Sequence, residues 1–351
     1  MTAAPVTPPI FDGHNDQLSK LLHDGDRRAF ADNPGAAIDV ARANTGGFAG
    51  GLFAIWIPSA QATGIDFGAM AAASFDVPLP DEVPRTTALP VAMAQIAILL
   101  DLERQGHLRI CRTAAEIRST MANNVMAAVL HMEGAEAIDE QLDTLDVFHA
   151  AGLRSLGPVW SRPNRFGHGV PFRFPGSPDT GPGLTPAGVR LVEHCNARRI
   201  MVDLSHITEA GFWDVARISK APLVASHSNA HALCTTTRNL TDRQLSAIAE
   251  TGGLVGINFA AAFLREDGRM SADVPLSRVL EHADYLIERL GEDGVGFGSD
   301  YDGAVVPAEI SGVERLPRLR QAMADRGYGP ALIAKLCHEN WVGVLERTWG
   351  A

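Results

Sequence analysis

Residues 10–16 read Ile-Phe-Asp-Gly-His-Asn-Asp, a short apolar run followed at once by carboxylates and an imidazole. The same order, apolar residues and then polar ones, returns along the chain. Apolar runs with the length of buried strands lie at 10–11, 51–57, 125–132, 153–159, 200–204, 222–225, 254–259 and 295–297. Segments with helical spacing follow most of these runs. The sequence therefore predicts strands that alternate with helices.

The expected helices carry start and stop signals. Thr185 followed by Pro186 is typical of a helix that begins with a capping threonine and a first-turn proline. Thr241 and Gln244 have the spacing of a capping box, and Gly252-Gly253 would end that helix. Longer helices are predicted at 89–105, 277–290 and 332–349.

Eight strands alternating with helices in a chain of 351 residues fit an α/β fold, specifically a (β/α)₈ TIM-type barrel. We expect a single barrel domain over residues 1–351, with long loops at the carboxyl ends of the strands. The competing architecture is a doubly wound open sheet.

The composition limits the classes of function. Lys and Arg number 30 against 41 Asp and Glu, so the formal charge of −11 disfavours binding to nucleic acid or to an anionic membrane. Residues 1–9 lack the basic and apolar regions of a secretory signal. No CxxC pair occurs among Cys111, Cys195, Cys234 and Cys337, which indicates isolated thiols in a reduced compartment. We therefore expect a cytoplasmic protein.

Polar side chains close five of the predicted strands. They occur in the segments Asp12-Gly13-His14-Asn15-Asp16, His131-Met132-Glu133-Gly134, Asp203-Leu204-Ser205-His206, Ser226-His227-Ser228-Asn229 and Gly298-Ser299-Asp300-Tyr301-Asp302-Gly303. In a barrel these ends converge on the face that carries the active site. Burying imidazoles and carboxylates together is unfavourable unless something compensates them, and a divalent metal would compensate all of them.

The spacing predicts a two-ion site. His14 and Asp16 are two residues apart on a strand, so both side chains point the same way and can bind one ion. Glu133 has two oxygens and could bridge to a second ion held by His206 and His227. Nitrogen and oxygen ligands without thiolate suit Zn²⁺, with Mn²⁺, Co²⁺ or Fe²⁺ as alternatives. Taken alone, each residue is better interpreted as a structural histidine or as a carboxylate at the start of a helix. Taken together, the residues favour the metal site.

Two further residues suit catalysis and substrate binding. Asp300 could take a proton from an activated water and deliver it to a leaving amine, whereas alone it could be a turn residue before Gly303. Arg238 could hold a substrate carboxylate in two-point contact, or it could be a surface ion-pair partner. His131 and Asp203 are interpreted as supporting residues.

Other chemistry-bearing patterns are absent or weak. The glycines of 294–298 lie within a predicted strand, so they do not indicate a phosphate-binding loop. The sequence contains no GxxxxGK[ST], GxSxG or HExxH motif.

The chain resembles the membrane (renal) dipeptidase family, the M19 metallopeptidases, in six segments between residues 12 and 303. These are Asp12-Gly13-His14-Asn15-Asp16, Met132-Glu133-Gly134, Asp203-Leu204-Ser205-His206, Ser226-His227-Ser228, Thr237-Arg238-Asn239 and Asp300-Tyr301-Asp302-Gly303. The resemblance implies a (β/α)₈-type barrel with two Zn²⁺ ions, His14 and Asp16 on one, His206 and His227 on the other, and Glu133 bridging. It also implies Asp300 as general acid/base and Arg238 as partner of the C-terminal carboxylate. Family members hydrolyse dipeptides, often with a D-residue at the C-terminal position, some open β-lactam rings, and many are homodimers.

One position departs from the family pattern. Trp160 stands where mammalian-type members carry a histidine that helps to polarise the scissile carbonyl. An indole N–H can donate one hydrogen bond but carries no charge. His168 is a candidate substitute, with a plain loop histidine as the alternative. Trp160 and His168 are thus candidate substrate-binding residues.

The loops 58–88 and 161–183 are longer than ordinary barrel connections and are expected to shape the substrate site. The second loop carries Arg162, Arg165 and Arg173. These could contact an acidic group of the substrate, or they could be solvated arginines on a rigid surface loop.

The sequence thus predicts a zinc-dependent dipeptidase in which a water bridging the two ions attacks the peptide carbonyl. One alternative is a binuclear amidohydrolase-type enzyme for a lactone, cyclic amide or phosphotriester. Such enzymes usually carry HxH and a bridging lysine, whereas this chain has HxD and only Lys20, Lys220 and Lys335. The other alternative is a non-catalytic peptide-binding barrel.

Overall fold

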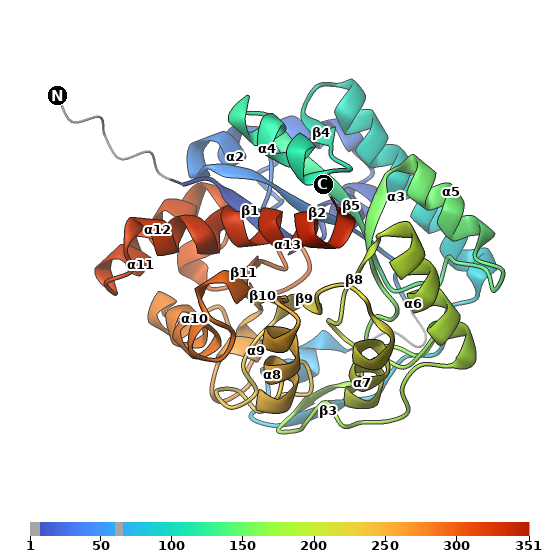
Figure 1. The fold of residues 1–351 in the computed structure, drawn as a ribbon. Coiled ribbons are helices and arrows are strands. Elements are labelled where there is room, and N and C mark those ends of the chain that lie inside the picture. Colours follow the sequence, from blue (N-terminus) through green and yellow to red (C-terminus); the bar gives the residue numbers. More distant parts are fainter. Residues whose placement is uncertain (1–7, 60–65, 351) are drawn as a thin grey trace.

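Parallel strands form the centre of the molecule, and helices lie around them (Figure 1). The computed structural model describes residues 8–59 and 66–350. The larger parallel sheet has the order β1-β2-β5-β6-β8 with β4 paired to β5, and the smaller one has the order β11-β10-β9. Their bounds are β1 Ile10–Asn15, β2 Phe48–Trp56, β4 Leu108–Ile110, β5 Met126–Glu133, β6 Leu153–Gly157, β8 Met201–Val202, β9 Val224–Ser228, β10 Leu254–Asn258 and β11 Val295–Gly298.

The predicted parallel α/β fold is confirmed, and every predicted strand is present with shifts at its ends. A closed barrel is not shown, because continuous strand pairing is confined to each of the two sheets. Single parallel bridges, Asp203 with Val224 and Asn15 with Tyr301, connect the edges of the sheets. Neighbouring strands follow one another along the chain, which differs from the strand order of a doubly wound sheet.

Two short strands lie over the carboxyl ends of the parallel strands, and the sequence did not predict them. Strands β3 (Phe75–Val77) and β7 (Phe172–Phe174) pair antiparallel, with Phe75 opposite Phe174. They join the two long loops that follow β2 and β6. These loops therefore form one structure rather than two separate ones.

Helices cover the outer faces of the sheets (Figure 1). They are α1 Gln17–Asp24, α2 Val40–Gly46, α3 Arg85–Arg104, α4 Ala114–Ala122, α5 Asp143–Ala151, α6 Pro186–Arg198, α7 Glu209–Ile218, α8 Asp242–Glu250, α9 Ala261–Leu264, α10 Leu276–Leu290, α11 Leu316–Asp325, α12 Pro330–Ala334 and α13 Asn340–Trp349. Short 3₁₀ turns are η1 Arg27–Ala31, η3 Phe67–Ala71, η4 Glu292–Gly294, η5 Ala308–Ile310 and η6 Val313–Arg315, and η7 Lys335–Glu339 is a π-helical turn.

The predicted helix caps are confirmed. Thr185 accepts a hydrogen bond from the backbone N–H of Gly188, 3.1 Å away, and Thr241 forms a capping box with Gln244. The predicted helix 332–349 is interrupted, because η7 separates α12 from α13.

Helix α3 is the one helix among the described residues that is long and apolar enough to cross a membrane. Part of its apolar surface packs into the core through residues such as Ile96 and Leu99, which are buried. Gln95, also buried, exchanges hydrogen bonds of 3.0 and 2.6 Å with the backbone of Trp56 in β2. These contacts tie α3 to the larger sheet.

A tryptophan from α13 fills the space among the strands beneath their polar ends. Trp341 is fully buried, and its indole N–H donates to the carbonyl of Phe297 at 2.8 Å. A Cβ atom at Gly13, Gly256 or Gly296 would lie within 2.2–2.9 Å of this indole ring. The glycines on β1, β10 and β11 therefore make room for the ring, which explains the glycine at position 296 of the 294–298 pattern.

Replacing Trp341 with Ala is expected to lower the free energy of unfolding by about 3–5 kcal/mol, because it leaves a cavity that the glycines cannot fill. Urea denaturation followed by circular dichroism measures the change. Trp213 is only half-buried on α7, so Trp213→Ala is the matched control and should cost less. Equal losses in the two variants would contradict the role of Trp341.

Candidate active site

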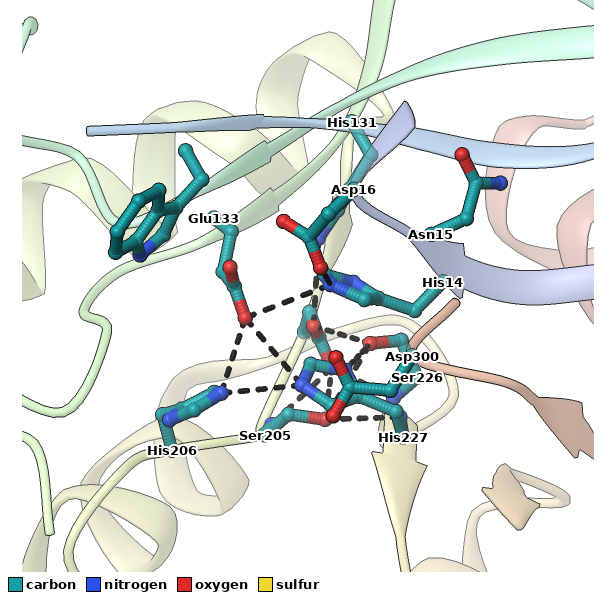
Figure 2. A network of polar contacts seen from close by, with 12 residues as sticks. His14, Asn15, Asp16, His131, Glu133, Ser205, His206, Ser226, His227 and Asp300 are labelled. Carbon is teal, nitrogen blue, oxygen red and sulfur yellow. Dashed lines mark hydrogen bonds and ion pairs between the residues drawn. The ribbon is translucent and has the colours of Figure 1, made fainter. Parts of the chain in front are cut away.

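The structure brings together the polar side chains that close the parallel strands (Figure 2). His14 lies on β1, Glu133 ends β5 and His227 lies on β9. His206 and Asp300 lie in the turns after β8 and β11, each with a positive φ, 67° and 60°. The carboxyl ends of parallel strands meet at one edge, so these distant segments converge there.

One carboxylate oxygen faces three imidazoles. Glu133 Oε1 lies 3.0 Å from His206 Nε2, 3.3 Å from His227 Nε2 and 3.6 Å from His14 Nε2. Asp16 Oδ2 lies 3.4 Å from His14 Nε2 on the other side. Possible ligand atoms of His14, Glu133 and His227 all lie within 4.8 Å of one another. All five side chains are buried.

Hydrogen bonds behind the imidazoles fix where their free nitrogens point. The hydroxyl of Ser226 donates to Asp203 Oδ2 at 2.6 Å and lies 2.7 Å from His227 Nδ1. A hydroxyl has one proton, so His227 Nδ1 must donate to Ser226 and Nε2 of the neutral ring is left with a lone pair. Ser161 Oγ lies 2.7 Å from His206 Nδ1. The Nε2 atoms of His206 and His227 face each other at 3.0 Å.

Charge is unevenly distributed among these groups. Burial would lower the pKa of His14, but the surrounding carboxylates, led by Glu133, outweigh it and raise this pKa to about 10. Burial raises the pKa of Glu133 well above its usual value and lowers the pKa of His206 and of His227 well below the usual one. Two imidazoles are therefore neutral, and carboxylates surround the third. This pattern favours a bound cation.

The donor set fits a divalent metal. Both nitrogens of His14 are buried without a hydrogen-bond partner among the described residues, which is costly unless a ligand satisfies them. The His227 lone pair points at other acceptors, an arrangement that a cation relieves. All ligand atoms are nitrogen or carboxylate oxygen, the set that Zn²⁺ and its transition-metal neighbours bind. The free cysteines, Cys111, Cys195, Cys234 and Cys337, are buried elsewhere.

Asp300 lies at the edge of this cluster. One of its carboxylate oxygens is within 4.8 Å of ligand atoms of His14 and Asp16, and Asn258 Nδ2 donates to Oδ2 at 3.0 Å. Burial raises the pKa of Asp300, although the nearby His14 opposes this rise. A carboxyl group with a raised pKa is suited to taking up and releasing a proton near neutral pH.

Arg238 is buried beside the cluster, with 3% of its surface exposed. Its guanidinium donates to the His227 carbonyl at 3.1 Å and to Ser228 Oγ at 3.4 Å, and it lies 5.3 Å from the ring centroid of Phe263. The Nε atom has no partner among the described residues. A buried guanidinium with unused donors can bind a carboxylate.

A cavity of about 150 Å³ opens beside these groups. Its polar side includes Asp16, Glu133, His206, Asp300 and Asp302. Its other side is an apolar wall formed by Trp56, Phe67, Met70, Trp160, Phe172, Phe263 and Met270. The cavity therefore joins a charged centre to an aromatic surface.

Trp160 and His168 occupy different surroundings. Trp160 lies in the cavity wall with its ring centroid 5.8 Å from that of His206. His168 is absent from the described cavity lining, and its Nδ1 lies 3.2 Å from the carbonyl of Gly183 within its own loop. The structure thus gives His168 a contact within its own loop, and its role in substrate binding stays a prediction.

The loop arginines are absent from the described cavity lining and pair with carboxylates. Arg162 is fully buried and donates to Glu136 Oε1 at 2.9 Å. Arg173 Nε lies 2.9 Å from Asp76 Oδ1, and Arg165 pairs with Glu140 at 3.3 Å. The expectation that these arginines contact an acidic substrate is not supported, since each already has a carboxylate partner.

Sequence reasoning missed the residues that hold the site in place. Ser226 lies next to His227 in the chain, so its position was a usable signal. Ser161 and Asn258 lie far from the histidine and aspartate that they contact, so neither had a local signal. Most of the apolar wall belongs to loops whose pairing was not predicted.

Fold and site define a metallohydrolase, with imidazoles and carboxylates that could hold a metal at the carboxyl ends of parallel strands. The chain belongs to the membrane dipeptidase family, peptidase family M19, which it matches over residues 3–349. It is a metallo-dipeptidase of that family, as its resemblance implied.

Solved structures agree with this assignment. Dipeptidase AC, a metallopeptidase of family M19, is 56% identical with a TM-score of 0.95, over 98% of this chain and 100% of that chain. The same values hold for a metallopeptidase from Rhodobacter sphaeroides liganded with a phosphinate mimic of the dipeptide L-Ala-D-Ala. An uncharacterized Klebsiella pneumoniae protein of the pqqA 5′ region is 49% identical over 263 residues, 74% of this chain and 97% of that protein.

Proposed function

We propose that the chain hydrolyses dipeptides with two zinc ions, His14 and Asp16 holding one, His206 and His227 the other, and Glu133 lying between them. The observation that carries this proposal is the single oxygen of Glu133 that faces three imidazole nitrogens within 3.6 Å. Mn²⁺, Co²⁺ and Fe²⁺ accept the same donors and are the alternatives to zinc.

When bound, such ions polarise the scissile carbonyl and lower the pKa of water. The chain's own residues supply the remaining steps. Asp300 accepts a proton at its carboxylate and delivers it to the leaving amine. Arg238 binds the C-terminal carboxylate of the dipeptide through its unused guanidinium donors. Trp160 contributes one indole N–H donor and shields the reacting groups from water.

The substrates we propose are dipeptides that include those with a D-residue at the C-terminal position. The L-Ala-D-Ala mimic bound to the Rhodobacter sphaeroides relative supports this class. The small cavity also favours short peptides, since it has little room for further residues.

We also propose that the two sheets act as one closed (β/α)₈ barrel in a single domain. The isolated bridges at both junctions support closure, since they join β1 to the segment after β11 and the residue after β8 to β9. Closure would hold His14 and Asp300 at a fixed separation, as the contact between Asp300 N–H and the His14 carbonyl at 3.0 Å requires.

The test is a panel of dipeptides, with L- and D-configured C-terminal residues, incubated with the zinc-loaded protein. We expect amine release from some members and about two zinc equivalents per chain by elemental analysis. Metal-loaded protein that releases no amine from any dipeptide would contradict the proposal. Hydrolysis of lactones instead would favour the amidohydrolase alternative, and peptide binding by a metal-free chain would favour a binding protein.

A further inference from the structure

The hydrolysis of a peptide bond does not itself require the apolar wall of the cavity. Its members come from scattered segments: β2, η3, the loop after β6, β7, α9 and the loop after α9. Many of them, including Met70, Trp160, Phe172 and Phe263, form a hydrophobic cluster separate from the main core. One side of this cluster is the cavity surface itself.

The wall is an ordered run of rings. Trp56 and Trp160 lie 5.2 Å apart between ring centroids, Trp160 and Phe172 5.9 Å, and Phe172 and Phe263 6.1 Å in a stacked pair. Phe67 lies 5.8 Å from Phe172. The rings therefore extend from β2 to Phe263. The guanidinium of Arg238, the proposed carboxylate-binding residue, lies over the ring of Phe263.

Met70 and Met270 support the wall from the loop side. The backbone N–H of Met270 donates to the Met70 carbonyl at 2.8 Å, which joins η3 to the loop after α9. Methionine side chains adapt to ligands of different shape, because they are flexible and polarizable. This part of the cavity is therefore suited to several apolar groups rather than to one.

No lysine or arginine is among the described residues that line the cavity. The guanidinium of Arg162 lies 5.1 Å from the ring centroid of Trp160, but it is bound to Glu136, and Arg173 is bound to Asp76. An acidic side chain placed against the wall would lose water and find no unpaired lysine or arginine beside it to offset that loss. An apolar side chain would be buried favourably there.

We propose that the apolar wall is a side-chain subsite that selects dipeptides whose C-terminal residue is apolar and rejects those whose C-terminal residue is acidic. The assignment to the C-terminal residue follows from Arg238, because the carboxylate it binds places the adjacent side chain near Phe263. This inference rests on the proposed dipeptidase function and adds the substrate class to it.

The experiment compares kcat/KM of the zinc-loaded enzyme for Ala-D-Leu, Ala-D-Asn and Ala-D-Asp, with the L-series and with Leu-D-Ala and Asp-D-Ala in parallel. We expect at least about a tenfold preference for Leu over Asp at the C-terminal position, with Asn between them. Hydrolysis of all members at equal rates would overturn the inference but not the function. A preference that depends on the N-terminal side chain instead would overturn the assignment of the wall to the C-terminal residue.

A variant at the cavity mouth tests the wall directly. Phe67 is 46% exposed, so Phe67→Arg introduces a cation without disturbing the core. We expect the Leu-to-Asp preference to fall about two- to fivefold, the effect of a partly exposed ion pair. Val147, 61% exposed on α5, gives the matched control Val147→Arg, which should leave the preference unchanged. Equal behaviour of the two variants would contradict the subsite.

Discussion

Replacing Asp300 with Asn is expected to lower kcat for dipeptide hydrolysis by about 10²–10⁴-fold, the range for loss of a general acid/base. Asparagine has nearly the same shape and can still accept the hydrogen bond from Asn258, so the fold should be kept. It cannot take up a proton, however. Steady-state kinetics on the zinc-loaded variant measure the loss.

The metal content of the same variant separates two roles of Asp300. Its carboxylate lies within 4.8 Å of possible ligand atoms of His14 and Asp16, close enough for a ligand role. Unchanged zinc content with lost turnover supports proton transfer, whereas lost zinc would show that Asp300 is a ligand. Asp325, exposed on α11, provides the control Asp325→Asn. Full activity of Asp300→Asn would remove the residue from the mechanism.

Replacing Glu133 with Gln is expected to remove metal and activity together. The substitution keeps the shape of the side chain but replaces a charged oxygen that faces three imidazoles with a neutral amide. Loss of a residue that merely orients a ligand weakens metal binding about 10- to 100-fold, and loss of a bridging ligand should exceed this. Zinc titration and dipeptide turnover measure the two effects.

A surface glutamate supplies the comparison for this variant. Glu140 pairs with Arg165 and Arg190 outside the site, and Glu140→Gln should bind zinc like the parent protein. Glu133→Gln that retains both ions and full turnover would contradict the bridging position. Retention of one ion with reduced turnover would assign Glu133 to a single ion.

The strand ends were predictable because two local signals coincide there. Short runs of Val, Ile and Phe mark buried strands, and the polar residues that follow have no reason to be buried unless they serve a site. His14, Glu133 and His227 therefore stood out from the sequence alone. The structure adds how their free nitrogens are directed.

Contacts between distant segments were not predictable in the same way. The pairing of β3 with β7 depends on residues that are about a hundred positions apart, and each strand is only three residues long. Arg162 looked like a loop cation, but its burial against Glu136 follows from tertiary packing. The relay from Asp203 through Ser226 likewise depends on neighbouring strands.

Trp341 has a consequence for synthesis of the protein. Helix α13 follows every strand in the chain, so all the strands leave the ribosome before the indole that fills the space among them. Without the indole, Gly13 and Gly256 would border an empty space, and the strand that carries His14 would lack its support. The nascent polypeptide would thus acquire its competence for metal binding only after translation has passed this tryptophan.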